Sequence, residues 1–155
     1  MCKVGNDDTS MIREYAETDL EFTAKIWLSS GQDEYYYLPA FQKLNEETAV
    51  DVFRREIQDK CSIWIHESGE EINGFMALNN NLIDRLYIDP FYQGPGIGSL
   101  FINFAKEIFP DGIHLKTHQL NKRAAVFYEK RGFRAVAFGV SPAPESMPDI
   151  EYRWP

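Results

Sequence analysis

A glycine-rich segment between a predicted strand and a predicted helix is the part of this sequence best suited to chemistry. It reads Gln93-Gly94-Pro95-Gly96-Ile97-Gly98, and Ser99 follows it. The first N–H groups of a helix have no partner within the helix, and the helix dipole adds partial positive charge at that end. Glycine has no Cβ, so the backbone can approach a phosphate group closely. The segment therefore predicts an anion-binding loop, with a purely structural tight turn as the alternative.

The spacing of the glycines argues against two common nucleotide-binding motifs. No lysine follows Gly98, as it would in a loop that binds nucleoside triphosphates. The dinucleotide-binding spacing Gly-x-Gly-x-x-Gly is also absent, because this segment reads Gly-x-Gly-x-Gly.

The elements that must position this loop follow from hydrophobic periodicity and from turn residues. We expect strands at 11–15, 62–67, 72–78, 82–88, 113–117, 133–140 and 150–154. A first helix is expected at about 20–28, after a cap at Thr18-Asp19, and a second helix begins after Asn45. A third helix runs from the glycine-rich segment to about residue 108, and a fourth covers 121–131. The segment 29–43 is rich in aromatic residues and contains Gly31 and Pro39, which predicts a loop or a broken helix.

This order of elements predicts the fold class. Antiparallel strands come first and two strand–helix–strand units follow, which is typical of an α+β fold. We expect one domain over residues 1–155, with a mixed, mostly antiparallel sheet flanked by helices. The strands at 82–88 and 113–117 should be parallel if they are neighbours, because a helix connects them.

Two segments resemble the signature motifs of the GCN5-related N-acetyltransferase (GNAT) superfamily. Gln93, Gly96 and Gly98 match its core motif, Gln/Arg-x-x-Gly-x-Gly/Ala. The run from Asn121 to Phe133 matches its second motif, which has an Asn, then Ala, then a Phe-Tyr pair before Gly-Phe. The order of elements matches the family over nearly the whole chain, so the resemblance implies the GNAT fold.

The resemblance also implies how acetyl-CoA, the expected co-substrate, is bound without a metal. The family binds pyrophosphate through backbone N–H groups of the loop, which here belong to Gln93, Gly94, Gly96, Ile97, Gly98 and Ser99. It pairs the pantetheine arm with the backbone of the preceding strand, here Leu86, Tyr87 and Ile88. By spacing, Asn121, Ala124 or Ala125, and Tyr128 share one helix face. In the family this face looks at the cofactor, with the Asn bonded to the arm and the Tyr beside the sulfur.

Two residues are the predicted catalytic groups. A phenol with a pKa of about 10 stays protonated at neutral pH, so Tyr128 can protonate a departing thiolate. Its alternative role is that of a half-buried aromatic residue packed beneath the loop. The candidate general base is Asp84, the one carboxylate of its strand, which period 2 places on the same face as Leu86 and Ile88. An ion pair or a solvated strand position is the alternative for Asp84.

The histidines and a tyrosine-rich segment receive no firm role. His114 and His118 alternate with Lys116, but a third metal ligand is missing, so we interpret them as ordinary strand and turn residues. His66 either lines the acceptor site or simply packs. Tyr35-Tyr36-Tyr37 falls where the family has its variable acceptor-binding segment, and a packed loop is the alternative.

Composition narrows the class of protein. The chain has 155 residues, of which 44% are hydrophobic and 26% charged, as in one globular domain. Its net charge of −8 argues against nucleic-acid binding. No apolar run approaches the roughly 20 residues that cross a bilayer, and the start does not resemble a signal peptide. Two cysteines far apart do not suggest a disulfide framework, so we expect a cytoplasmic protein. We also expect a monomer or a homodimer.

The charge is unevenly distributed along the chain. Residues 1–90 carry 8 basic and 18 acidic side chains, whereas residues 91–134 carry 7 basic and 3 acidic ones. We expect four of the basic residues near the 3′-phosphate end of CoA: Lys122, Arg123, Lys130 and Arg131. Four acidic residues are expected in or near the acceptor site: Glu34, Glu46, Glu47 and Asp84. This division favours a cationic acceptor, and an acidic surface that only aids solubility is the alternative.

The predicted activity is transfer of the acetyl group of acetyl-CoA to a primary amine, by direct attack in a ternary complex. The amine belongs to a small molecule or to a protein: a polyamine, a basic small molecule, a lysine or an amino terminus. The alternative is a non-catalytic acyl-CoA-binding or sensing module on the same fold. The motif residues Gly96, Asn121 and Tyr128 favour the enzyme.

Overall fold

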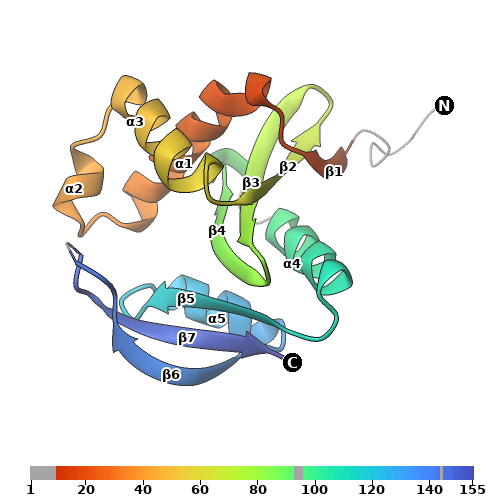
Figure 1. Cartoon of the computed structure of the whole chain (residues 1–155), viewed down its shortest axis with the longest axis vertical. Helices are drawn as coiled ribbons and strands as arrows, with labels where there is room; N and C mark the ends of the chain where they lie inside the picture. The colour runs from red at the N-terminus through yellow and green to blue at the C-terminus, as the bar shows by residue number, and fades with distance from the viewer. Residues whose placement is uncertain (1–9, 93–95, 144) are drawn as a thin grey trace.

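Seven strands form one sheet in the computed structural model, which describes residues 10–92, 96–143 and 145–155. The strand order is β1-β2-β3-β4-β5-β7-β6 (Figure 1). Every neighbouring pair is antiparallel except β4 and β5, which are parallel. The predicted α+β class, with a mixed and mostly antiparallel sheet, is confirmed. The strands are β1 (Ser10–Glu14), β2 (Ser62–Ser68), β3 (Glu71–Asn79), β4 (Leu82–Ile88), β5 (Ile113–His118), β6 (Arg134–Val140) and β7 (Pro148–Trp154).

Five α-helices accompany the sheet in the described part of the chain. They are α1 (Leu20–Glu34), α2 (Pro39–Gln42), α3 (Glu46–Phe53), α4 (Ile97–Ile108) and α5 (Lys122–Lys130). A π-helical turn, Arg54–Gln58, continues α3, and short 3₁₀ turns lie at Glu17–Asp19 and Pro90–Tyr92. The first helix is longer than predicted and takes in the first part of the segment 29–43, whose remainder contains only the short α2. The helix predicted after Asn45 is confirmed, and the Asn45 side chain caps it by accepting from the Thr48 N–H at 2.8 Å.

Helices cover the sheet on both faces, so its central strands are buried on both sides. In β3, Phe75 and Ala77 belong to a core cluster with residues of α1 and α3. Met76 and Leu78 belong to a second cluster with residues of α4 and β5. Alternate side chains of one strand thus supply two cores, as the period of 2 requires. No helix among the described residues has the length and hydrophobicity to cross a bilayer.

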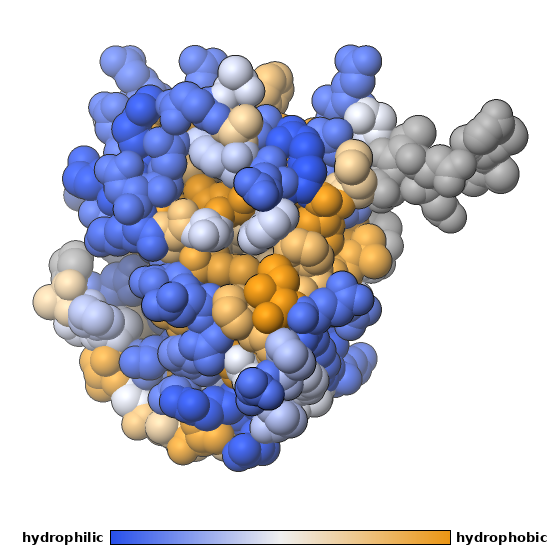
Figure 2. Space-filling view, turned by 45° about the vertical axis from the view of Figure 1, so that its right-hand side comes forward, coloured by the Kyte–Doolittle hydropathy of each residue, from blue (hydrophilic) through white to orange (hydrophobic). Residues whose placement is uncertain are grey.

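One face of the molecule leaves hydrophobic side chains in contact with solvent. Figure 2 shows a hydrophobic band near the middle of this view, with hydrophilic residues above and below it. Where α4 lies against β1, Met11 is 51% exposed and Leu100 is 47% exposed, and both line a hollow of about 300 Å³. The outward side of α4 is therefore less polar than that of a fully solvated helix.

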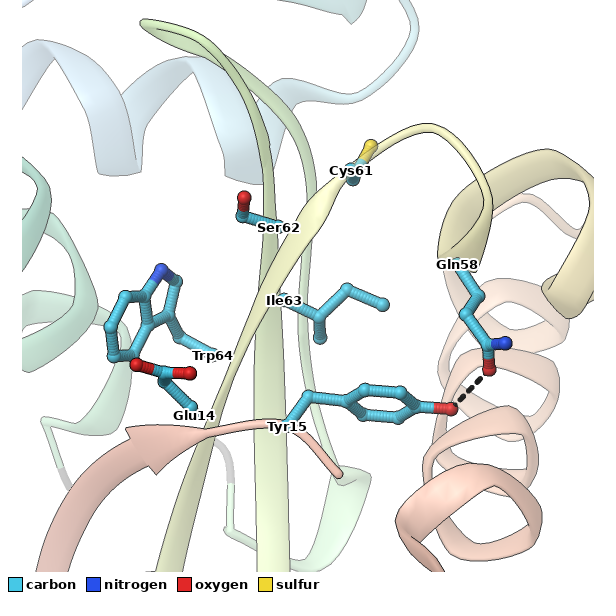
Figure 3. Close-up of a pocket in the computed structure, with 7 residues that line it drawn as sticks. All are labelled: Glu14, Tyr15, Gln58, Cys61, Ser62, Ile63 and Trp64. Carbon is cyan, nitrogen blue, oxygen red and sulfur yellow. Dashed lines mark hydrogen bonds between the residues drawn. The ribbon is translucent and has the colours of Figure 1, made fainter. Parts of the chain in front are cut away.

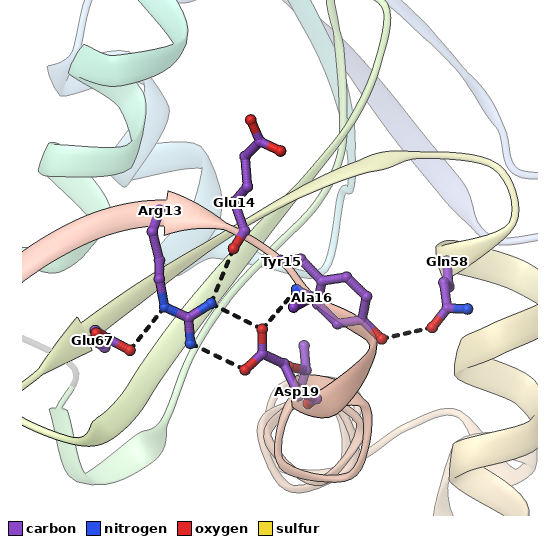
Figure 4. Close-up of polar contacts among 8 residues, drawn as sticks. Arg13, Glu14, Tyr15, Ala16, Asp19, Gln58 and Glu67 are labelled. Atoms are coloured by element: carbon purple, nitrogen blue, oxygen red, sulfur yellow. Dashed lines mark hydrogen bonds and ion pairs between the residues drawn. The ribbon is translucent and has the colours of Figure 1, made fainter.

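A polar network fixes the start of α1 against the first two strands (Figure 4). The Arg13 guanidinium donates to both carboxylate oxygens of Asp19, at 2.9 and 3.0 Å, and to Glu67 of β2 at 2.9 Å. Asp19 also accepts from the Ala16 N–H at 2.8 Å. Asp19 does occupy the predicted N-cap position, but its side chain makes no cap hydrogen bond to α1. The predicted cap position is therefore confirmed, while the Asp19 carboxylate pairs with Arg13 and caps the preceding 3₁₀ turn through the Ala16 N–H.

Candidate active site

The parallel strands β4 and β5 part soon after they begin, and this divergence organises the candidate site. The one residue pair recorded between them joins Leu82 to His114, at the start of each strand. Further along, the end of β4 pairs with β3 on one side and forms no recorded residue pair with β5 on the other side. This end of the strand consists of Leu86, Tyr87 and Ile88. A strand edge that has no neighbouring strand can pair with an extended ligand, and at this edge the Ile88 carbonyl already accepts from the Ser30 hydroxyl at 2.8 Å. These three residues could thus pair with a pantetheine arm, and that pairing stays a prediction.

A β-bulge at Asp84 causes part of this divergence. Ala77 of β3 is opposite Arg85, but the next residue, Leu78, is opposite Ile83, so Asp84 has no partner in β3. A bulge adds one residue, reverses the alternation of faces and increases the local twist. Ile83 therefore joins the core cluster of α4 and β5, to which Leu86 and Ile88 also pack.

The predicted position of Asp84 on the same face as Leu86 and Ile88 is consequently wrong. Its carboxylate accepts from the Cys61 thiol, with Sγ to Oδ2 at 3.4 Å, and forms an ion pair with Arg85 at 3.4 Å. Burial, with the Asp84 charge as the next cause, raises the pKa of the Cys61 thiol to about 12. The catalytic role of Asp84 stays a prediction.

The glycine-rich loop leads directly into α4, as predicted. Gln93 and Gly94, two of the predicted cofactor-binding residues, lie outside the described residues. Gly96 is the N-cap of α4, with φ of 92°, a left-handed conformation that favours glycine. Among the described residues, no atom lies within 4 Å of a Cβ added at Gly96, so the described structure leaves space beside this N-cap.

The other residues of the first turn of α4 have packing roles in addition to any role toward a ligand. The Ile97 side chain is buried in the core cluster of α4 and β5. A Cβ on Gly98 would meet the ring of Phe127 in α5 at 2.8 Å, so this glycine allows α4 and α5 to approach each other. The Ser99 hydroxyl accepts from Arg131 Nε at 3.0 Å, and the Arg131 guanidinium lies 3.7 Å from the centre of the Phe127 ring. The structure thus brings Arg131 to the loop.

Helix α5 presents Asn121 and Tyr128 toward the interior, as their spacing predicted. Both are 8% exposed. The Asn121 side chain caps α5 by accepting from the Ala124 N–H at 3.1 Å. The helix ends at Gly132, whose φ is 92°, while the Phe133 N–H donates to the Tyr128 carbonyl at 3.1 Å.

Tyr128 lies near Tyr35, Tyr87 and Tyr152, and these four residues form the tyrosine cluster. The ring of Tyr128 is 5.5 Å from that of Phe133 and 6.4 Å from that of Tyr152, centre to centre. Burial, together with the nearby charge of Glu34 and the phenol of Tyr87, raises the pKa of the Tyr128 hydroxyl above its usual value. The phenol therefore stays protonated at neutral pH, as an acid catalyst requires.

The end of α1 brings a carboxylate to the same cluster. Burial is the largest cause that raises the pKa of the Glu34 carboxyl group, while interactions with Tyr35, Asn121 and Arg123 oppose the rise. Glu34 is nevertheless an exposed residue, so neighbouring groups crowd its carboxyl group while the side chain keeps contact with solvent. Glu34 and Tyr128 come from α1 and α5, which are far apart in the sequence.

Tyr37, which belongs to the segment considered for acceptor binding, forms a chain of hydrogen bonds nearby with His118 and Glu145, for which the sequence predicted no functional role. The Tyr37 hydroxyl lies 2.8 Å from Nδ1 of His118, and Nε2 of His118 lies 3.2 Å from a carboxylate oxygen of Glu145. Our interpretation of His118 as an ordinary turn residue overlooked this chain. The one available signal was the position of His118 at the end of β5, three residues before Asn121.

A hollow of about 360 Å³ opens elsewhere, beside β1 and β2 (Figure 3). Tyr15 crosses it and donates to Gln58 at 2.6 Å. Its lining contains no residue of the glycine-rich loop, of α5 or of the tyrosine cluster: it comprises Glu14, Tyr15, Gln58, Cys61, Ser62, Ile63 and Trp64. We do not assign acetyl transfer to this hollow.

The residues at the divergence of β4 and β5 fit a phosphate-bearing thioester. The space beside Gly96 lies at the positive end of the α4 dipole, and Arg131 adds a guanidinium beside Ser99. Among the described residues, no group of three His, Cys, Asp or Glu side chains is arranged to hold a metal ion.

Comparisons with known proteins agree with this geometry. Residues 59–135 match the family described as Acetyltransferase (GNAT) domain. The peptidyl-lysine N-acetyltransferase YjaB of Salmonella typhimurium is 29% identical over 124 residues, which cover 79% of this chain and 82% of that protein.

Two solved structures have the same fold. The solution structure of apo-form YjaB from Escherichia coli has a TM-score of 0.78 and 21% identity, covering 94% of this chain and 97% of that one. The PaiA N-acetyltransferase of Thermoplasma acidophilum in complex with coenzyme A has a TM-score of 0.68 and 21% identity, covering 94% and 98%. The chain therefore belongs to the GCN5-related N-acetyltransferase superfamily, and its activity is acetyl-CoA-dependent transfer of an acetyl group to an amine.

Proposed function

We propose that this enzyme acetylates the side-chain amine of lysine in a peptide or protein, with Tyr128 as the acid and Glu34 as the carboxylate that attracts the acceptor. The observation that carries the proposal is the position of the Glu34 carboxyl group, which lies close enough to the phenol of Tyr128 to influence its pKa. Similarity to YjaB, named a peptidyl-lysine N-acetyltransferase, supports the same acceptor.

The charges around Glu34 explain why a cation is preferred. Glu145 contributes a second carboxylate on the same side, because its charge reaches Tyr37 and Tyr87. Two basic side chains lie nearby: Arg85, which is paired with Asp84 at 3.4 Å, and Arg123, whose charge reaches Glu34 and offsets part of the negative charge. A lysine ammonium entering between the carboxylates gains favourable Coulomb energy that an anionic amine does not. Two other acidic residues expected near the acceptor, Glu46 and Glu47, lie in the exposed first turn of α3.

The acid step uses the phenol of Tyr128. When the acceptor amine attacks the thioester carbon of acetyl-CoA, the C–S bond breaks and the thiolate leaves. The Tyr128 hydroxyl donates its proton to that sulfur and is later reprotonated from solvent. A phenol held protonated by burial can perform this step throughout the neutral pH range.

Binding of the co-substrate is assigned to the loop and to β4. We infer that backbone N–H groups from residues 93–99 hold the pyrophosphate and that Leu86, Tyr87 and Ile88 pair with the arm. The structure brings Arg131 to the loop, whereas Arg123 lies near Glu34. Of these two residues, Arg131 is the better placed to contact a phosphate.

A CoA-release assay across a matched panel of amines tests the proposal. A lysine peptide with a blocked amino terminus should be acetylated faster than a free glutamate amine, and added salt should reduce the preference because it screens the charges. Spermidine provides the polyamine comparison. Equal or better rates with glutamate would contradict a cationic acceptor, and a marked preference for spermidine would reassign the acceptor to a polyamine.

A further inference from the structure

The hydrogen-bonded chain Tyr37–His118–Glu145 joins three separate segments at the edge of the site. Tyr37 lies between α1 and α2, His118 ends β5, and Glu145 lies between β6 and β7. The His118 side chain is 12% exposed, whereas that of Glu145 is 46% exposed. A nearly buried imidazole therefore connects a phenol to a carboxylate that water can reach.

The partners of His118 determine which nitrogen carries its proton. A carboxylate only accepts hydrogen bonds, so Nε2 must carry a proton to donate to Glu145. In a neutral imidazole the other nitrogen, Nδ1, is then an acceptor. The Tyr37 hydroxyl must therefore donate to Nδ1, at 2.8 Å. Its oxygen lone pairs remain available to accept a proton from another group.

Aromatic packing places this chain next to the tyrosine cluster. The ring of Tyr35 contacts both His118, at 5.2 Å between centres, and Tyr37, at 6.0 Å. Tyr35 is in turn close enough to Tyr87 and Tyr128 to be influenced by their charges. The chain therefore lies on the same side of the site as the predicted acid, within electrostatic reach of it through Tyr35.

We propose that Tyr37 accepts the proton that the acceptor ammonium must lose, while His118 takes the proton of Tyr37. The proposal rests on the proposed function, because it requires a protonated amine acceptor. One N–H bond of the ammonium breaks as an O–H bond forms on Tyr37, and the original Tyr37 proton moves to Nδ1 of His118. The imidazolium is stabilised by Glu145 and later loses its proton to water. No group is oxidised or reduced, and Tyr37 is unchanged at the end.

The relay operates only when His118 begins neutral. In an imidazolium both ring nitrogens donate, so Nδ1 can no longer accept from Tyr37. Titratable and charged groups lie around this imidazole. They are Tyr35 and Tyr37 from the segment between α1 and α2, Glu145 from the β6–β7 connection, Asp149 opposite it on β7, Lys116 two residues before it on β5, and Glu34 at the end of α1, whose charge reaches Tyr37.

The test is the pH dependence of kcat with a lysine peptide at saturating acetyl-CoA. In the wild type, kcat should rise with pH and reach a plateau once His118 is neutral. His118→Asn keeps an acceptor for Tyr37 but cannot take its proton, so kcat should fall by about 10²-fold near neutral pH. The plateau should also be lost, because solvent hydroxide must then remove the proton. An unchanged profile shape in this variant would overturn the relay.

The matched control is His114→Asn. His114 is on the same strand and approaches Glu151 at 3.8 Å, but it does not contact the tyrosine cluster in the described structure. This variant should keep both the wild-type kcat and the plateau. Asp84→Asn tests the alternative base, the carboxylate predicted from the sequence. If Asp84→Asn loses it while His118→Asn keeps it, Asp84 is the base and the relay is wrong.

Two further variants keep the test decisive if His118→Asn does not fold. Tyr37→Phe retains the ring contacts but not the hydroxyl, so kcat should fall by about 10²-fold while KM for acetyl-CoA stays unchanged. Glu145→Gln removes the anion that stabilises the imidazolium of the relay, so kcat should fall while KM for acetyl-CoA stays unchanged. Full activity in both Glu145→Gln and Tyr37→Phe would reject the relay.

Activity of the wild type separates this proposal from the proposed function. If the wild type acetylates the lysine peptide and the variants behave like it, the relay fails while the function stands. If the wild type releases no CoA with any amine, both fail.

Discussion

At the residue scale, the position of Tyr128 explains why a tyrosine suits the acid step. Its phenol is buried, and burial favours the neutral form. The group therefore keeps its proton at neutral pH. A carboxyl group with an ordinary pKa would be almost fully ionised there and would have little proton to donate.

We expect Tyr128→Phe to lower kcat by about 10²-fold, because it removes the proton donor and keeps the ring. KM for acetyl-CoA and thermal stability should change little, since the ring contacts with Phe133 and Tyr152 remain. Steady-state kinetics and a melting curve measure both effects. An unchanged kcat, under conditions in which chemistry limits turnover, would remove Tyr128 from the mechanism.

Glu34→Gln tests the charge that attracts the acceptor. The substitution keeps the size of the side chain and removes its charge, so kcat/KM for the lysine peptide should fall by about tenfold, equivalent to about 1.4 kcal/mol. The rate with a neutral acceptor should change less. Glu46→Gln is the control, since Glu46 is an exposed carboxylate in the first turn of α3. A similar effect of the two substitutions would mean that Glu34 has no special role.

At the element scale, the start of α4 combines two uses of glycine. Gly96 provides a left-handed N-cap with space beside it, whereas Gly98 makes room for the ring of Phe127. The first glycine leaves room for a ligand and the second sets the distance between α4 and α5. Only a substitution of Gly96 therefore tests phosphate binding directly.

We expect Gly96→Val to abolish stabilisation by CoA. At a concentration one hundred times Kd, a ligand bound only by the native state adds about 2.7 kcal/mol to the free energy of unfolding. Valine at Gly96 fills the space beside this N-cap. Melting curves with and without CoA measure the effect.

The matched control is Gly69→Val, in the turn between β2 and β3. Gly69 also has a positive φ, 62°, and also has nothing within 4 Å of an added Cβ. Both variants carry the same kind of backbone strain, but Gly69→Val should keep the full CoA shift. If Gly96→Val also keeps it, the loop does not bind the pyrophosphate.

At the scale of the whole molecule, the Arg13 network links the stability of the fold to pH. The hydrogen bond from Arg13 is the largest cause that lowers the pKa of the Asp19 carboxyl group. In the unfolded chain this carboxyl titrates near its usual value of about 3.9. The stabilisation is therefore fully present above that value and is lost as the pH falls through the lower pKa of the folded state.

Urea unfolding of the wild type and of Asp19→Asn tests this linkage. At pH 7 the variant should be less stable by about 1–3 kcal/mol, since it weakens a charged hydrogen-bond pair that is partly buried. The difference should shrink in acid, as the wild-type carboxyl becomes protonated. Glu17→Gln, at an exposed ion pair with Arg54, should cost less than about 1 kcal/mol. A difference for Asp19→Asn that does not depend on pH would contradict the linkage.

The sequence alone was sufficient for features that depend on neighbouring residues. The bounds of β4 match the prediction, the cap of α3 at Asn45 is confirmed, and Gly132 ends α5 as expected. Each of these features is set by local chemistry: alternation of side chains, a capping side chain, or a glycine at positive φ. The glycine-rich loop before α4 could be recognised for the same reason.

Only the tertiary structure decided which distant residues meet. The bulge at Asp84 depends on the register between two strands, and one inserted residue reverses a face that alternation alone predicts. The Tyr37–His118 contact joins residues 81 positions apart, and the contact with Glu145 spans another 27. Local periodicity carries no information about such pairs, because they are fixed by the packing of the segment after α1 and of the β6–β7 connection around the end of β5. For this reason the loop predicted to bind the co-substrate could be located from the sequence, whereas the groups proposed to surround the acceptor could not.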